Sequence, residues 1–153
     1  MRIETNDFGF GEIIYAYTRE QALEDGVLID VSEMGKEAGF KIPVAVTESV
    51  WGMINNIPPA YQGIQDVPGR LWDVLWMGTC AARRNPDKDM VLYKLKLTRI
   101  EQKNHATKDE KTGEEMIKQE CSLVHDVTLK IVIGPGDQGE PVITIMLPNE
   151  DKE

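Results

Sequence analysis

Residues 69–84 read Gly-Arg-Leu-Trp-Asp-Val-Leu-Trp-Met-Gly-Thr-Cys-Ala-Ala-Arg-Arg and form the clearest helical pattern in the chain. Apolar residues recur in two adjoining stripes at the three- and four-residue spacing of an α-helix. The first stripe comprises Leu71, Val74, Leu75, Gly78 and Ala82, and the second comprises Trp72, Trp76 and Cys80. Two adjoining stripes predict a helix that is buried over most of its circumference, tryptophans included. We therefore expect this segment to be the core helix.

After this helix the pattern changes to alternation. Apolar and polar residues alternate over residues 91–98 and again over 123–133, and a third apolar run covers residues 142–147. Alternation with a period of two predicts antiparallel strands that bury one face and expose the other. The sequence therefore predicts a C-terminal three-stranded antiparallel meander, with the tryptophan-bearing helix packed against it.

The first half of the chain predicts three short helices joined by extended segments. Hydroxyl side chains that accept backbone N–H bonds mark the helix starts, and glycine marks helix ends because it adopts positive φ at low cost. The helices are expected to be capped by Thr18, Ser32 and Thr47, and the extended segments to cover residues 27–31 and 41–46. Pro43 lacks an N–H group, so we expect the second extended segment to lie outside a central strand.

These elements predict an α+β fold, with a helical N-terminal half and short extended segments packed on the C-terminal meander. The length of 153 residues fits one globular domain and no repeat is visible, so we expect a single domain over residues 1–153. Residues 101–120 are dense in charge, and Lys111, Thr112 and Gly113 have turn chemistry. This stretch predicts a charged hairpin arm near residues 101–120.

Charge and hydropathy exclude several classes of protein. The chain carries 26 acidic and 17 basic residues, a net charge of −9, which opposes direct nucleic-acid binding because such binding needs cationic side chains. No apolar run approaches the ~20 residues of a membrane span. Residues 1–7 lack the basic and apolar pattern of a secretory signal. We therefore expect an acidic cytoplasmic protein that contacts neither a membrane nor nucleic acid.

The residues that carry most catalytic chemistry are scarce. Cys80 and Cys121 have no metal-ligand spacing, and we expect both to be reduced thiols that are buried or half-buried. His105 and His125 are the only imidazoles, and no Ser-His-Asp order or paired-histidine motif can be assembled around them. We therefore expect no metal and no cofactor, and the case for an enzyme is weakened but stays open.

Two polar clusters are candidates for binding a ligand. Arg70 and Asp73 are three residues apart at the start of the predicted core helix, so both project near its N-terminus, where an anion is favoured. Tyr17, Arg19, Asp25 and Asp30 form the second cluster and offer acid and base groups near predicted turns. Each cluster also has a structural interpretation, the first as a helical ion pair and the second as turn and cap residues.

The turn at residues 134–140 is a third candidate, as an interaction surface that presents Asp137 and Glu140. Its glycines suggest a phosphate-binding loop, but a predicted strand follows in place of a helix, and the lysine of a P-loop is absent. A hairpin turn is therefore the favoured interpretation of this segment.

Four blocks of sequence together resemble one known family. They are residues 17–31 with Tyr-Thr-Arg-Glu-Gln-Ala and Asp-Gly-Val-Leu-Ile-Asp-Val, residues 43–51 with Pro-Val-Ala-Val-Thr, residues 69–76 with Gly-Arg-Leu-Trp-Asp-Val-Leu-Trp, and residues 134–148 with Gly-Pro-Gly-Asp and Pro-Val-Ile-Thr-Ile-Met-Leu-Pro. The chain resembles an uncharacterised family of small bacterial proteins of unknown function, often carried on plasmids or phages. The resemblance implies a mobile-element accessory protein, and it implies no activity, substrate or cofactor.

Two functions fit these observations. The first is a non-catalytic acidic interaction or inhibitor protein that has a protein partner and acts on a host macromolecule. The missing catalytic residues favour it. The alternative is a small enzyme or anionic-ligand-binding protein that uses a Tyr/Arg/Asp cleft. The alternative requires the cluster around Arg19 and the cluster around Arg70 to converge on one pocket.

Overall fold

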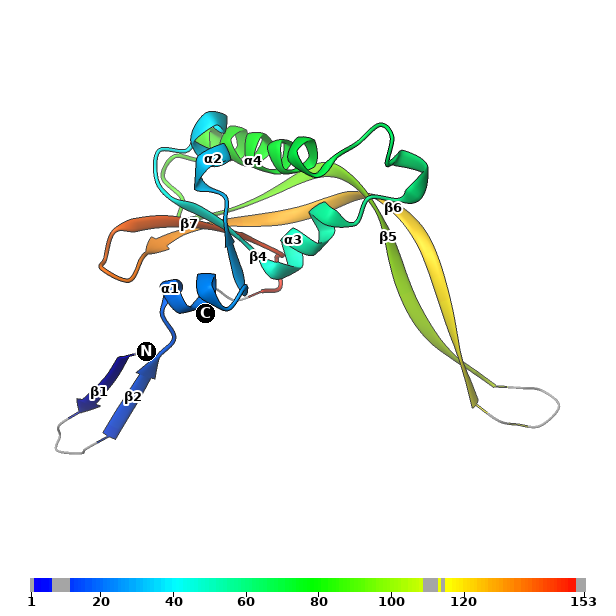
Figure 1. Ribbon diagram of the computed structural model, residues 1–153, viewed down its shortest axis with the longest axis horizontal. Helices are drawn as coiled ribbons and strands as arrows, with labels where there is room; N and C mark the ends of the chain where they lie inside the picture. The colour runs from blue at the N-terminus through cyan, green and yellow to red at the C-terminus, as the bar shows by residue number, and fades with distance from the viewer. Residues whose placement is uncertain (1, 7–11, 109–112, 114, 151–153) are drawn as a thin grey trace.

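A mixed five-stranded sheet in the order β3-β4-β7-β6-β5 organises the structure. The computed structural model describes residues 2–6, 12–108, 113 and 115–150 (Figure 1). Its elements in chain order are β1 (Arg2–Asn6), β2 (Glu12–Ala16), α1 (Arg19–Glu24), β3 (Leu28–Asp30), α2 (Ser32–Ala38), β4 (Val44–Thr47), α3 (Glu48–Asn55), the 3-10 turn η1 (Pro59–Tyr61), α4 (Val67–Arg84), β5 (Met90–Lys108), β6 (Glu115–Pro135) and β7 (Pro141–Met146).

The expected C-terminal three-stranded antiparallel meander is wrong, because two further strands join the sheet and one of them pairs in parallel. β5, β6 and β7 pair antiparallel, but β7 also pairs in parallel with β4, which in turn pairs antiparallel with β3. Pro43 does not prevent this, since β4 begins at Val44 and the missing N–H group precedes the ladder. The Pro43 carbonyl itself accepts a bond of 2.8 Å from the Ile143 N–H group.

The main core lies between this sheet and the helices α2, α3 and α4. Val74 and Leu75 of α4 are fully buried, and the Tyr93 hydroxyl of β5 donates a bond of 2.9 Å to the Val74 carbonyl. A side-chain carbon at Gly78 would lie 2.9 Å from Ile131 Cδ1, so glycine allows α4 to approach the sheet closely. Figure 1 shows α2 and α4 together along one side of the sheet. The tryptophan-bearing helix therefore packs on the sheet.

The orientation of α4 differs from the sequence expectation. The helix begins at Val67, two residues early, because the Asp66 side chain caps it by accepting a bond of 2.8 Å from the Gly69 N–H group. Trp72 and Trp76 are 37% and 42% exposed, so the prediction that the tryptophans are buried is wrong. At 3.6 residues per turn their stripe is centred about 140° from the first stripe, and only the first stripe faces the sheet.

The short helices of the first half begin close to where the sequence predicts. The capping box of α1 forms between Thr18 and Gln21, and Thr47 caps α3. Ser32 is not the cap of α2 but its first residue, and its hydroxyl accepts a bond of 3.0 Å from the Val44 N–H group. The hydroxyl therefore joins the start of α2 to β4. The β1–β2 hairpin, which no local pattern predicts, forms a separate two-stranded sheet.

β5 and β6 continue beyond the rest of the sheet as a two-stranded ribbon (Figure 1). The described register runs out to the pair Lys108 and Glu115. The turn expected at Lys111 and Thr112 lies outside the described residues. Cys121, in this part of β6, is exposed, so the expectation of a buried or half-buried thiol is wrong for Cys121, whereas Cys80 is half-buried. Neither cysteine forms a disulfide.

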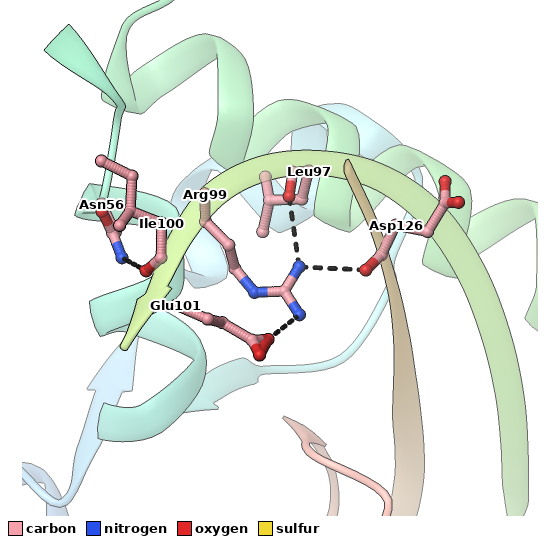
Figure 2. Close-up of polar contacts among 6 residues, drawn as sticks. All are labelled: Asn56, Leu97, Arg99, Ile100, Glu101 and Asp126. Atoms are coloured by element: carbon pink, nitrogen blue, oxygen red, sulfur yellow. Dashed lines mark hydrogen bonds and ion pairs between the residues drawn. The ribbon is translucent and has the colours of Figure 1, made fainter. Parts of the chain in front are cut away.

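The ribbon begins at a register shift between Lys96 and Arg99, where the Arg99 side chain is only 9% exposed. Figure 2 shows its guanidinium inside the bend, where it donates to the Leu97 carbonyl at 3.3 Å and the Asp126 carbonyl at 3.0 Å. It also forms an ion pair of 3.0 Å with Glu101. A bulge leaves main-chain carbonyls unpaired, and Arg99 satisfies two of them across both strands.

No helix in the described part of the chain is both long enough and apolar enough to cross a membrane.

Candidate functional site

The first candidate cluster lies at the start of α1. Arg19 donates from Nη1 to the Thr144 hydroxyl and from Nη2 to the Ile143 carbonyl, both at 2.8 Å, so its side chain lies across β7. Burial lowers the pKa of Arg19, and the nearby carboxylates of Asp30, Asp137 and Glu140 oppose that shift. Both Nη atoms of Arg19 therefore bind the sheet and join α1 to it.

Asp137 caps α1 from the β6–β7 turn. Its two carboxylate oxygens accept bonds from the Arg19 N–H group at 2.7 Å and the Glu20 N–H group at 2.9 Å. The Thr18 hydroxyl accepts a bond of 3.0 Å from the Gln21 N–H group, and the Thr18 N–H group donates one of 3.4 Å to Gln21 Oε1. The four N–H groups that a helix start leaves unpaired are thus all bonded within the chain. The anion position at this N-terminus is filled by the chain's own carboxylate.

Glu140 folds back onto its own turn. Its Oε1 accepts a bond of 2.9 Å from the Gln138 N–H group, and its carbonyl accepts one of 2.6 Å from Gly136. Gly139 has a φ of 82°, the left-handed conformation that favours glycine. The segment connects β6 to β7 as a hairpin turn, in line with the favoured interpretation of its glycines.

Tyr17 and Asp30 are also engaged locally. The Tyr17 hydroxyl donates a bond of 2.7 Å to Asp25, which joins the two ends of α1. This hydrogen bond raises the pKa of Tyr17. Asp30 Oδ1 accepts bonds from the Ser32 N–H group at 3.0 Å and from the Ser32 hydroxyl at 2.5 Å. Both carboxylates thus have the roles in turns that their positions beside helix ends predict.

Arg70 is the most deeply buried charged side chain in the described residues, at 3% exposure. All five of its N–H donors have acceptors: four backbone carbonyls and one side-chain amide. The partners are the carbonyls of Ile54, Met53 and Thr98 at 2.8 Å, the carbonyl of Asn56 at 3.5 Å, and Gln65 Oε1 at 2.8 Å. Burial lowers the pKa of Arg70. Arg70 therefore ties the end of α3 to α4 and β5, and no donor remains for a ligand.

Asp73 is exposed and makes no hydrogen bond to Arg70 in the described structure. It lines an open cleft of about 600 Å³ together with Trp72, Lys96 and Ile64. Partial burial raises the pKa of Asp73, and the positive charge of Arg70 opposes the shift. Arg70 lines the same cleft, which lies beside the aromatic surface described below, but Asp73 is exposed there whereas Arg70 is buried.

The two candidate clusters lie on opposite faces of the sheet. Ile143 and Ile145 of β7 face the main core beneath α4, so Thr144 between them faces the other way. Arg19 binds Thr144 on that second face, whereas Arg70 belongs to α4 on the first. The structure therefore does not bring the Tyr17, Arg19 and Asp30 cluster to the same cavity as Arg70.

The outer face of α4 carries two tryptophans, Trp72 and Trp76, that the helical pattern predicts to be core residues but that are exposed. The rings of Trp72 and Trp76 are stacked, with centroids 6.1 Å apart and planes 5° from parallel. Ile64, 81% exposed, lines the cleft beside Trp72. We call Ile64, Trp72, Asp73 and Trp76 the tryptophan face. In the sequence, this face is indicated by the angle around the helix between the tryptophan stripe and the stripe that contains Leu71 and Val74.

These contacts define an α+β protein with a mixed five-stranded sheet and an aromatic surface on its longest helix, in which Arg19, Arg70 and Arg99 bind main-chain carbonyls. In the described residues, no three His, Cys, Asp or Glu side chains gather in a way that could hold a metal ion. The Family of unknown function (DUF6573) matches residues 5–151, and the chain belongs to this family. The resemblance to an uncharacterised family agrees with this match. No curated protein and no solved structure matches the chain.

Proposed function

We propose that this protein is a non-catalytic interaction protein that binds another protein through the tryptophan face of α4. The observation that carries the proposal is the stacked, solvent-exposed pair of Trp72 and Trp76. Exposed apolar patches of this kind mark interaction sites, and tryptophan is enriched among the residues that dominate binding energy. The two residues are 37% and 42% exposed, and a partner that covers both gains hydrophobic free energy that offsets part of the entropy cost of association.

The charge of the protein supports a partner with a basic surface. The whole chain has a net charge of −9, whereas the cleft beside Trp72 is balanced, with Asp66 and Asp73 against Arg70 and Lys96. Opposite charge across an interface speeds the encounter and suppresses wrong partners. The β5–β6 ribbon offers a second contact surface, because a two-stranded ribbon alone is at best marginally stable in water and gains from packing on a partner.

The alternative function, a small enzyme or anionic-ligand-binding protein with a Tyr/Arg/Asp cleft, has less support. It needs Arg19 and Arg70 to direct unused donors into one cavity. Arg70 instead gives all its donors to groups of the chain, and Arg19 binds β7 on the other face of the sheet. Asp137 and Glu140, the other candidate interaction residues, are both engaged by main-chain N–H groups.

The finer parts of the proposal concern setting and mode of action. We propose a cytoplasmic accessory protein of a mobile element that inhibits a macromolecule of its host. The support is the acidic composition and the resemblance of the four sequence blocks. Direct binding to nucleic acid is disfavoured by the same negative charge.

Quantitative affinity capture from lysate of the cell that encodes the protein tests this function. The bait is the full chain, compared with Trp72→Ala/Trp76→Ala and with Met90→Ala/Leu92→Ala, a control that removes two exposed apolar side chains elsewhere. We expect a protein that the wild type and the control retain and that the tryptophan variant loses. The proposal is contradicted if all three baits retain the same proteins. It is also contradicted if the wild type retains no protein at any salt concentration.

A further inference from the structure

We propose that a second site, on the opposite end of α4 from the tryptophan face, binds a small phosphate-bearing molecule. The site is an open pocket of about 590 Å³ between α2, the loop at residues 39–43 and the last turn of α4. This volume lies within the range of about 300–1,000 Å³ that is usual for small-molecule sites. The proposal does not rest on the proposed function.

The charge of the pocket is the first observation. Lys36, Lys41 and Arg83 line it, and no acidic residue does. Residues 1–50 contain ten acidic and only four basic residues, and two of those four bases are here. All three residues are exposed, so a ligand in solution can reach their charges, and an anion in the pocket is attracted by all of them. An acidic chain that gathers its cations in this way favours an anionic ligand.

The availability of the donors is the second observation. In the described part of the structure, no hydrogen bond or ion pair joins the side chain of Lys36, Lys41 or Arg83 to another group. A guanidinium has five N–H donors and each ammonium has three. This contrasts with Arg19, Arg70 and Arg99, whose guanidinium groups bind backbone carbonyls. The pocket cations therefore keep donors for the oxygens of a phosphate group.

The loop geometry is the third observation. Gly39 has a φ of 115°, and a side-chain carbon there would lie 2.9 Å from Arg83 Nη2 and 3.1 Å from Thr79 Cγ2. The absence of a side chain allows the Arg83 guanidinium to lie directly against the loop. Helix-end electrostatics explains a cation in the last turn of α2 and of α4. It does not explain Lys41, which follows both the helix and the loop glycine.

The remaining lining indicates the kind of molecule. Ile42, which is half-buried, gives the pocket apolar surface next to its cations, and Phe40, which is only 6% exposed, adds little to it. A phosphate group on an apolar or aromatic body, as in a nucleoside diphosphate, matches this combination. A nucleic-acid strand fits less well, because the net charge of −9 repels the rest of a polyanion.

Isothermal titration calorimetry on the full chain with ADP, inorganic pyrophosphate and adenosine tests the site. The test variant is Lys36→Gln/Arg83→Gln. The matched control is Arg84→Gln/Lys88→Gln, which removes the same charge from exposed residues outside the pocket. Thermal melting of both variants checks that they remain folded.

We expect at least one phosphate-bearing probe to bind the wild type and the control equally, with adenosine much weaker. We expect the test variant to lose about 30-fold or more in affinity, since hydrogen bonds to charged groups are strong. The proposal is overturned if neither phosphate probe binds at millimolar concentration. It is also overturned if adenosine binds as well as ADP, or if the control loses as much affinity as the test variant.

Discussion

Replacement of Arg70 by methionine removes the guanidinium that joins α3, α4 and β5 while it keeps an unbranched side chain of similar reach. In the native protein this side chain is 3% exposed and forms five hydrogen bonds. Methionine leaves the carbonyls of Ile54, Met53 and Thr98 without this donor. Buried acceptors that lose their partners carry the full cost of desolvation.

The size of the effect follows from the burial of each bond. The bond from Nε to the Ile54 carbonyl is fully buried, and its loss costs about 2 kcal/mol. The other four bonds are part-buried, so water can replace them in part, and each costs about 0.5 kcal/mol. We therefore expect a loss of about 4 kcal/mol, a large fraction of the about 5–15 kcal/mol that stabilises a domain.

Urea unfolding followed by tryptophan fluorescence measures this loss. Arg84→Met is the control, because Arg84 is an exposed arginine in the same helix and its replacement should change stability by no more than about 0.5 kcal/mol. A cost below about 1 kcal/mol for Arg70→Met, with the slope of the transition unchanged, would refute the structural role of the guanidinium.

Three further predictions concern the core. Burial raises the pKa of Tyr93, so only the unfolded chain releases this proton above about pH 10, and stability should fall there by about 1.4 kcal/mol per pH unit. Urea titrations from pH 9 to pH 11 measure this fall, and Tyr93→Phe is the variant that should lack the Tyr93 contribution to it. Gly78→Ala forces a carbon to within 2.9 Å of Ile131 Cδ1 and should cost about 1–3 kcal/mol. Gly52→Ala, at a helix position with open space, should instead raise the free energy of unfolding by about 0.5–1 kcal/mol. Equal effects of the two substitutions would contradict the close packing of Gly78 against Ile131. Thr79 Oγ1 is buried without a hydrogen-bond partner in the described structure, so Thr79→Val should raise the melting temperature. A lower melting temperature would mean that the hydroxyl has a partner.

The parts of the fold that the sequence predicts well depend on residues a few positions apart. The Thr18 and Gln21 capping box spans three residues, and the buried stripe of α4 repeats every three or four. The parallel pairing of Val44 with Ile143 joins strands about a hundred residues apart. No local pattern specifies which strand a short apolar segment will pair with, and Pro43 argued misleadingly against a central position. The meander was therefore a plausible but wrong reading of the three long C-terminal strands.

The candidate site shows the same limit. Polar residues beside buried ones were a correct sign of specific contacts, but the sequence does not say whether the partner is a ligand or the chain itself. Arg70 and Asp137 find their partners within the fold, Asp137 across 118 residues. A ligand role for Tyr17, Arg19 or Asp73 stays a prediction, as does the single-domain organisation.

The most direct test of the account is the solvent exposure of the tryptophan face. The chain has three tryptophans, so Trp51→Phe leaves the stacked pair as its only indole fluorophores. We predict that the emission of this variant is red-shifted relative to that of a buried indole, and that acrylamide quenches it clearly but less than in the unfolded chain, because the two residues are 37% and 42% exposed. Blue-shifted emission that resists quenching in the folded monomer would mean that Trp72 and Trp76 are buried, and it would remove the surface on which the proposed interaction depends.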